Sequence, residues 1–323
     1  MFTLLRRHLR LVGLVGIIVS LLNCAFVVFY VNRPQPPTSW HQKQRHIREF
    51  MPRKGAEFLA SPRGPCPSFL AVLVTSRAEH VFKRKAARDS WAQDADGNET
   101  RVYFVLGKQP DNTSLQDIVR SEIATYGDII QADFVDTRRN GTLKTVFLLQ
   151  WVVTTCPRVH FVMKATDYAF VNVPNLHRYL QMREDEERGP FVAGSVVMKR
   201  PVQGDPLAPG DLPPVIYQKP TFPPFLEGFA YVMPGEAVEV ILNKALDTPF
   251  LYLEDVFVTG VVAGEGLQVP LVNSECFQSC ATPTPPCAHH WFLAVCSNDT
   301  TQWGTLRVES RRICTEHDVN LHC

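Results

Sequence analysis

The stretch best suited to chemistry is residues 161–176, which read FVMKATDYAFVNVPNL. An apolar run ends at Lys164, the carboxylate of Asp167 follows, and a second apolar run leads into a helix started by Pro174. Open α/β folds build ligand sites where a strand delivers such side chains to the carboxyl edge of its sheet. We therefore expect a binding site around Asp167.

Basic side chains lie close to this site in the expected chain order. Arg84 and Arg88 belong to a helix that directly follows the first buried strand, a position that suits binding of a nucleotide's phosphates. Lys144, at the start of a later helix, offers the same interpretation. For all three the alternative is a solvated basic helix face.

Two adjacent acids, Glu254 and Asp255, stand where another helix is expected to begin, in the sequence LYLEDVFVTG. The helix dipole at such a position favours the ionised carboxylate, which is the form that a general base needs. The alternative interpretation of Asp255 is an N-terminal helix cap without any catalytic role.

Alternating strands and helices must position these residues. Strands are expected at residues 68–75, 101–106, 128–134, 161–164, 191–197 and 225–233, and helices at 76–91, 115–126, 143–155, 174–182 and 235–246. This alternation implies right-handed crossovers and a doubly wound, mostly parallel sheet. Residues 204–224 contain seven prolines and are expected to form a long loop.

The amino-terminal region predicts a membrane anchor. Residues 11–31 carry no charge, and 21 residues suffice to cross a bilayer core of ~30 Å. Basic residues in segment 1–10 place that short tail in the cytosol and the rest of the chain in the lumen. A cleaved signal peptide is the alternative, but the run exceeds the usual apolar core of such peptides. Residues 32–67, rich in proline and basic residues, are expected to be a stem.

The cysteines and glycosylation sequons agree with a lumenal chain. Eight of nine cysteines follow the apolar run, and six lie in the tail at residues 274–323. Disulfides are favoured over zinc, because the spacings match no zinc motif and the expected compartment is oxidising. Acceptor asparagines for N-glycosylation are Asn98, Asn112, Asn140 and Asn298. The 33 basic and 32 acidic residues are interspersed, which argues against nucleic-acid binding.

Several of these stretches resemble the β-1,3-galactosyltransferase and β-1,3-N-acetylglucosaminyltransferase family of the secretory pathway. The similar segments are Arg84-x-x-x-Arg88-x-x-Trp91, the tract YGDIIQADFVDTRRNGTLKT at residues 126–145, residues 161–174, the turn and strand at 225–233, and Glu254-Asp255-Val256. The resemblance covers residues 68–273, a region it identifies as a GT-A-like glycosyltransferase domain. It implies a Golgi type II membrane enzyme that transfers galactose or N-acetylglucosamine from a UDP-sugar to a glycan acceptor with inversion.

The resemblance also assigns roles to individual residues. Asp255, with Glu254, is implied as the catalytic base. The donor would be bound by Arg84, Arg88, Lys144, Lys164 and Asp167, and the acceptor side would be formed by Glu227, Gly228 and Tyr231.

One departure from the family pattern concerns the metal. Where the family has an Asp-x-Asp motif that holds manganese, this chain has Thr166, Asp167 and Tyr168, so only Asp167 remains as a metal ligand. Two interpretations stay open: an active transferase with little metal dependence, and a catalytically impaired pseudoenzyme or partner subunit with the same fold. An α/β hydrolase is excluded, because the chain lacks a G-x-S-x-G motif.

Overall fold

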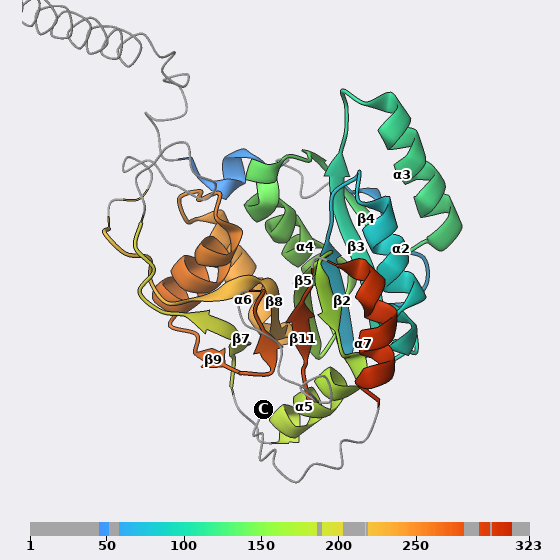
Figure 1. Cartoon of the computed structure of the whole chain (residues 1–323). Helices are drawn as coiled ribbons and strands as arrows, with labels where there is room; N and C mark the ends of the chain where they lie inside the picture. The colour runs from blue at the N-terminus through green and yellow to red at the C-terminus, as the bar shows by residue number, and fades with distance from the viewer. Residues whose placement is uncertain are drawn as a thin grey trace, which may run out of the picture. The chain divides into compact units, whose positions relative to one another are not determined.

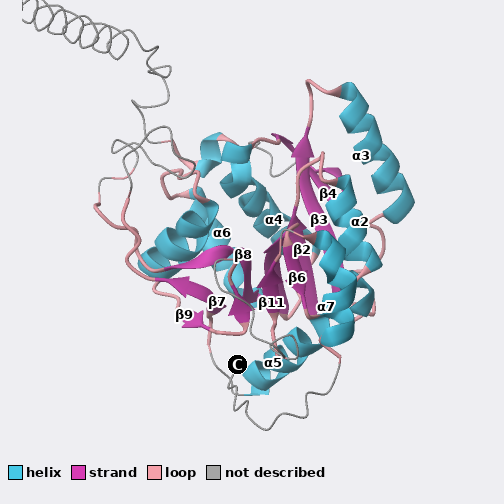
Figure 2. Ribbon diagram, in the orientation of Figure 1, coloured by secondary structure: helices cyan, strands magenta, loops and turns pink. Residues whose placement is uncertain are grey.

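The computed structural model describes residues 45–51, 58–185, 189–202, 217, 219–280, 291–297 and 299–311. Within them an eight-stranded mixed sheet is covered by helices on both faces (Figures 1 and 2). In spatial order its strands are β1 (Phe58–Ala60), β4 (Ile129–Val135), β3 (Thr100–Lys108), β2 (Leu70–Thr75), β5 (Phe161–Thr166), β8 (Phe225–Pro234), β7 (Val192–Val197) and β9 (Leu271–Asn273). A second sheet joins β10 (Phe277–Gln278), β11 (Ala294–Cys296) and β6 (Ala169–Val171).

The α-helices are α2 (Val81–Asp89), α3 (Thr113–Tyr126), α4 (Gly141–Thr155), α5 (Val173–Asp185), α6 (Gly235–Leu246) and α7 (Trp303–Glu309). Shorter or irregular helical segments are η2 (Ile47–Glu49), η3 (Trp91–Asp94), η4 (Arg138–Asn140), η5 (Val256–Gly266) and η7 (Thr300–Gln302). The segment η5 is a π-helix of 11 residues, a geometry often found at functional sites.

The central strands have doubly wound topology. β2, β3 and β4 are parallel and follow one another outward, whereas β5 pairs in parallel with the opposite side of β2. The expected mixed, mostly parallel sheet is confirmed, because four of its seven strand pairings are parallel. From β2 the chain adds β3 and β4 on one side and then crosses back to add β5 on the other side. The carboxyl ends of β2 and β5 therefore border the crevice where such folds bind ligands.

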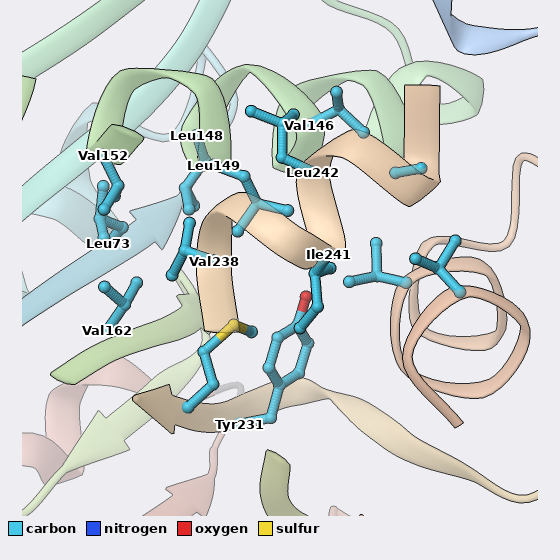
Figure 3. Close-up of a cluster of buried hydrophobic side chains, with 14 of the residues drawn as sticks. Leu73, Val146, Leu148, Leu149, Val152, Val162, Tyr231, Val238, Ile241 and Leu242 are labelled. Carbon is cyan, nitrogen blue, oxygen red and sulfur yellow. The ribbon is translucent and has the colours of Figure 1, made fainter. Parts of the chain in front are cut away.

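Alternation along the central strands divides the core between two faces. Leu73 and Val162 pack against helices α4 and α6 (Figure 3). Val72 and Met163 pack on the opposite face, in the cluster that includes residues of α2, α5 and α7. The same alternation extends to the strand ends, and therefore decides which layer each functional side chain meets.

Local signals explain several helix ends. Asn112 caps α3 by accepting a hydrogen bond from the backbone N–H of Leu115, and Gly127 ends that helix at φ 66°. The expected helix end at Gly127 is therefore confirmed, and so are the bounds of α6.

The packed domain begins earlier in the chain than the expected stem boundary at residue 67. Ile47 is fully buried in the core, and β1 adds an antiparallel edge strand to β4. A disulfide joins Cys66 to Cys156, at the end of α4. The residues from 45 onward that the structure describes therefore belong to the domain.

The cysteine-rich tail also contributes to the fold in its described residues. β11 pairs with β6, and α7 buries Trp303 and Leu306 in the core, where Figure 1 shows α7 and β11 in front of the central strands. A disulfide links Cys280 to Cys296, and Cys276 is disulfide-bonded as well. Disulfide bonding in this chain is thus confirmed.

Several expectations fall outside the described residues. These are the apolar run at 11–31, most of the loop at 204–224, Asn298 and the last twelve residues of the tail. In the part of the chain that the structure describes, no helix has the length and apolar character needed to span a membrane.

Candidate active site

Asp167 lies at the carboxyl edge of the sheet, beside the end of β2. Thr75 and Thr166 are register partners, so the next residues, Ser76 and Asp167, lie side by side. Ser76 Oγ donates to Asp167 Oδ2 at 2.6 Å, and His80 Nδ1 lies 2.7 Å from the same oxygen. Lys83 Nζ is 3.7 Å from Oδ1. The expected position of Asp167 at the strand end agrees with this arrangement.

The environment keeps Asp167 ionised. Only 5% of its side chain is exposed, and this burial opposes ionisation. The hydrogen bonds from His80 and Ser76 outweigh burial and lower the pKa of the carboxyl. Because the carboxylate only accepts hydrogen bonds, the Nδ1 atom of His80 carries the hydrogen, which leaves its Nε2 atom directed elsewhere.

A second buried network forms on the other face of β5, around Glu254. Lys164 Nζ donates to Glu254 Oε2 at 2.7 Å and to the carbonyl oxygen of Gly228 at 2.5 Å. Thr145 Oγ1 and the Tyr231 hydroxyl both donate to Glu254 Oε1, at 3.0 and 2.7 Å. Both oxygens of Glu254 are therefore occupied, so this acid is suited to positioning its neighbours.

Asp255 has fewer hydrogen-bond partners than Glu254. It is partly exposed, and its Oδ1 accepts a hydrogen bond of 2.9 Å from the backbone N–H of Val256. No side chain in the described part of the chain donates a hydrogen bond to its Oδ2. Burial raises the pKa of Asp255, and the negative charge of Glu254 raises it further. The expectation that the helix start would favour the ionised form is therefore corrected, because burial and the adjacent acid outweigh it.

Gly228 fixes the position of the two acids from the side of β8. A Cβ atom at this position would lie 3.1 Å from the Asp255 Cβ atom and 3.3 Å from Glu254 Oε2. A side chain at this position would therefore crowd both acids, and the close approach of the β8 backbone favours glycine here.

The other residues expected on the acceptor side have different surroundings. Glu227 is partly exposed and accepts a hydrogen bond from Ser279 of the tail. Tyr231 is fully buried, and Figure 3 shows its side chain beside Ile241 within the core. Burial raises the pKa of Tyr231 far above its usual value, so its hydroxyl stays a donor to Glu254. The structure thus places Tyr231 beneath the acids, away from an acceptor-facing surface.

Lys144 connects the ends of β4 and β2. Its Nζ atom lies 2.9 Å from Asp136 Oδ1 and donates to the carbonyl oxygen of Ser76. Burial lowers the pKa of Lys144, an effect that Asp136 partly offsets. The ammonium group is occupied by these partners, so its contacts are those of a residue that holds two strand ends together.

Arg84 and Arg88 also lie in a structural network instead of an open phosphate site. Arg84 is 0% exposed, and its guanidinium forms a two-pronged ion pair with Glu122 of α3. Arg88 binds both Glu122 and Asp128 and stacks over Tyr126. Their contacts do not favour the donor-binding role expected from sequence, because carboxylates of the chain already occupy both cations.

The residues in the expected metal position do not fit a divalent cation. Thr166 offers a neutral hydroxyl, which donates to the carbonyl oxygen of Phe229 at 3.3 Å. Tyr168 offers a phenol. Oδ2 of Asp167 already binds a hydroxyl and an imidazole, and its Oδ1 has a longer contact with the Lys83 ammonium. Hard divalent cations prefer several unoccupied carboxylate or carbonyl oxygens, and the side chains of this set supply at most Asp167 Oδ1.

Sequence reasoning missed Ser76 and His80, and it did not foresee the contact of Thr145 with Glu254. Lys83 belongs to the basic face of the helix expected at 76–91, which the sequence predicts to lie near a nucleotide's phosphates. Ser76 and His80 have common residue types, and no motif marks them. The one available signal is position, because Ser76 and His80 directly follow the first buried strand, whose carboxyl end borders the crevice. Thr145 neighbours Lys144, which sequence reasoning did select.

The expected glycosylation sites differ in accessibility. Asn98 and Asn112 are exposed, whereas Asn140 is partly buried and its Nδ2 donates to the carbonyl oxygen of Val135 at 2.7 Å. Oligosaccharide attachment is sterically simplest at the first two.

Comparisons with known proteins find relatives of this chain. A family model described as galactosyltransferase matches residues 82–275. Beta-1,3-galactosyltransferase 5 from Homo sapiens is 32% identical over 216 residues, covering 65% of this chain and 69% of that protein. Beta-1,3-galactosyltransferase 1 from Mus musculus is 32% identical over 207 residues, covering 62% and 63%.

Among solved structures, the galactosyltransferase LgtC in complex with donor and acceptor sugar analogues aligns with 76% of this chain and 98% of its own. The sequence identity is 8% and the TM-score is 0.39.

Proposed function

Since the chain belongs to the β-1,3-galactosyltransferase family, a family of sugar-transferring enzymes, we propose that it transfers a hexose from a UDP-sugar to a glycan acceptor. The relatives' names favour galactose as the sugar, with N-acetylglucosamine as the alternative. The acceptor would be a glycan on a glycoprotein or glycolipid, joined through a β-1,3 linkage. The observation that carries the proposal is Asp255, a partly exposed carboxylate with one free oxygen and a raised pKa.

In the proposed reaction, Asp255 acts as general base. Its free carboxylate oxygen takes the proton from the acceptor hydroxyl. The hydroxyl oxygen of the acceptor attacks C1 of the donor sugar in the same step. The bond between C1 and the diphosphate oxygen breaks, and UDP leaves with the bonding electrons. Attack opposite the leaving group inverts the configuration at C1. A raised pKa makes Asp255 a stronger base than an ordinary aspartate.

Glu254 supports this base without replacing it. Its contacts with Lys164, Tyr231 and Thr145 fix the backbone from which Asp255 projects. Its charge also raises the pKa of Asp255. Gly228 allows β8 to approach both acids closely, which restricts the positions that Asp255 can take.

We also propose that the protein is a single-pass type II protein of the Golgi membrane with its domain in the lumen. The uncharged run at 11–31, the basic tail before it and the disulfide-bonded cysteines support this proposal. A decrease in mass on glycosidase treatment, traced to glycans at Asn98 or Asn112, would agree with it. Extraction of an unglycosylated protein without detergent would contradict it.

The activity is tested with the full chain in detergent and a panel of UDP-sugars. We expect release of UDP with galactose transfer to a β-linked glycan, and a β-1,3 linkage in the product. A second candidate, a non-catalytic binding subunit, is favoured by the altered residues Thr166 and Tyr168. UDP binding without turnover of any donor would support that candidate and reject the enzyme.

A further inference from the structure

We propose that Lys83, which lies beside Asp167 and Tyr168, binds the diphosphate of the donor and replaces the divalent metal implied by the family pattern. This inference rests on the proposed use of a UDP-sugar. A departing UDP carries two to three negative charges, and some positive group must offset them for the transfer to proceed. The question is which cations of this chain remain able to do so.

The four cations expected from sequence already have internal partners. Arg84 and Arg88 bind the carboxylates of Glu122 and Asp128, as described above. Lys144 binds Asp136, and Lys164 binds Glu254. A phosphate that recruited any of them would have to break a buried ion pair, which is costly because the remaining acid would stay buried without its partner.

Lys83 is different, because its ion pair is loose. Its Nζ atom lies 3.7 Å from Asp167 Oδ1, longer than a hydrogen bond, and 27% of its side chain is exposed. The ammonium group lies over the ring of Tyr168, 5.6 Å from its centroid. The ring attracts the cation without neutralising its charge. Lys83 can therefore turn its N–H groups toward a phosphate while keeping its contact with Tyr168.

His80 positions Asp167 beside this lysine. Its Nδ1 atom is committed to Asp167 at 2.7 Å, and 31% of its side chain is exposed. In the described part of the chain, no group makes a hydrogen bond to its Nε2 atom. His80 and Lys83 both project from the start of α2, which follows β2 at the crevice between β2 and β5. The other nearby cation, Arg77, is paired with Glu79.

The altered residues 166 and 168 have a role in this arrangement. A carboxylate at position 168 would pair with the ammonium of Lys83, whereas the phenol of Tyr168 leaves it charged and available. The departure from Asp-x-Asp and the loosely paired lysine are therefore linked in this arrangement.

Calorimetric titration of the full chain in detergent tests the proposal, with UDP and uridine as probes and either EDTA or manganese present. For the unmodified chain we expect UDP affinity to differ less than about tenfold between the two conditions. Lys83→Ala should weaken UDP binding about tenfold, or about 1.4 kcal/mol, without changing uridine binding.

The matched control is Lys85→Ala, on the same helix, because Lys85 is exposed and paired with Asp89. It should bind UDP like the unmodified chain. Equal UDP affinity in Lys83→Ala and the unmodified chain would overturn this inference and leave the proposed function standing. A manganese requirement above about a hundredfold would do the same. Failure of the unmodified chain to bind UDP in either condition would overturn both.

A gain-of-metal variant provides an independent check. The double change Thr166→Asp with Tyr168→Asp restores the two acids, which would bind manganese and pair with Lys83. We expect UDP binding by this variant to become manganese-dependent and to lose its sensitivity to Lys83→Ala. Binding that stays independent of manganese and sensitive to Lys83→Ala would contradict the role assigned to Tyr168.

Discussion

Replacing Asp255 by Asn separates catalysis from stability unusually well, because the structure predicts opposite effects on the two. The amide oxygen of Asn can still accept the hydrogen bond from the N–H of Val256, so the local backbone is retained. The amide cannot take a proton from an acceptor hydroxyl. Loss of a general base typically costs ~10² to 10⁴ in rate, or about 2.7 to 5.4 kcal/mol of barrier at 1.36 kcal/mol per tenfold.

The stability effect follows from the raised pKa of Asp255. A carboxyl whose pKa is higher in the folded protein stabilises the fold below its unfolded pKa, and this contribution is lost as pH rises through the folded pKa. At neutral pH the ionised Asp255 is therefore unfavourable for folding. The neutral Asn removes that cost, so Asp255→Asn should unfold at the same temperature as the unmodified chain or at a higher one.

Thermal unfolding, UDP titration and turnover are measured on the same preparation at neutral pH. We expect a large loss of turnover with unchanged UDP affinity and no loss of thermal stability. For the unmodified enzyme, kcat/KM should fall as pH decreases through the raised pKa of Asp255, because protonation removes the base. A variant with more than a tenth of normal turnover would refute the base assignment. A clear decrease in unfolding temperature would refute the electrostatic reasoning.

Three further changes test other parts of the site. Gly228→Ala should displace both acids and therefore reduce turnover more than UDP affinity. Denaturant unfolding should show a loss of about 1 to 3 kcal/mol of stability. Unchanged turnover would show that the close approach is unimportant. Arg84→Met leaves Arg88 as the remaining cation beside Glu122, so the free energy of unfolding should fall by about 3 to 5 kcal/mol. A loss of UDP affinity without loss of stability would instead support a donor-binding role for Arg84. Replacing Cys280 and Cys296 together by Ser should lower the free energy of unfolding by about 3 kcal/mol, as for other loops of similar length. It should also weaken UDP binding, because β11 pairs with β6, the strand that follows Tyr168. Full UDP affinity would exclude that coupling.

The strands of the sheet were accessible to sequence reasoning because their composition reflects burial. β2 is a nearly continuous apolar run and β5 is mostly apolar apart from Lys164, and both are buried, which gives a clear signal. β1 gives no such signal, since it is a three-residue edge strand that pairs across a bulge. β10 and β11 are similarly short, and pairing with β6 decides their structure.

The sequence predicted where several site residues lie in the fold, but it predicted their roles less well. Asp167 and Asp255 could be selected because each stands at the end of a strand or the start of a helix. The role of Arg84 could not, because it depends on Glu122, which lies 38 residues away on another helix. An arginine near a nucleotide site and an arginine in a buried ion pair have the same local sequence. Tertiary contacts alone distinguish them.

The alternation of β5 explains how one strand serves both halves of the proposed reaction. Lys164 faces α4 and η5 and holds Glu254 beside the base, whereas Asp167 meets α2 and the cations that follow β2. A register shift of one residue would exchange these faces, so the pairing of β5 with β2 and β8 constrains both halves together. The backbone frame around residues 161–171 is thus required by the fold whether or not a metal is bound. The resemblance of this stretch to the family therefore reflects the fold, and the charge of residues 166 and 168 can differ when, as proposed above, Lys83 takes over the diphosphate.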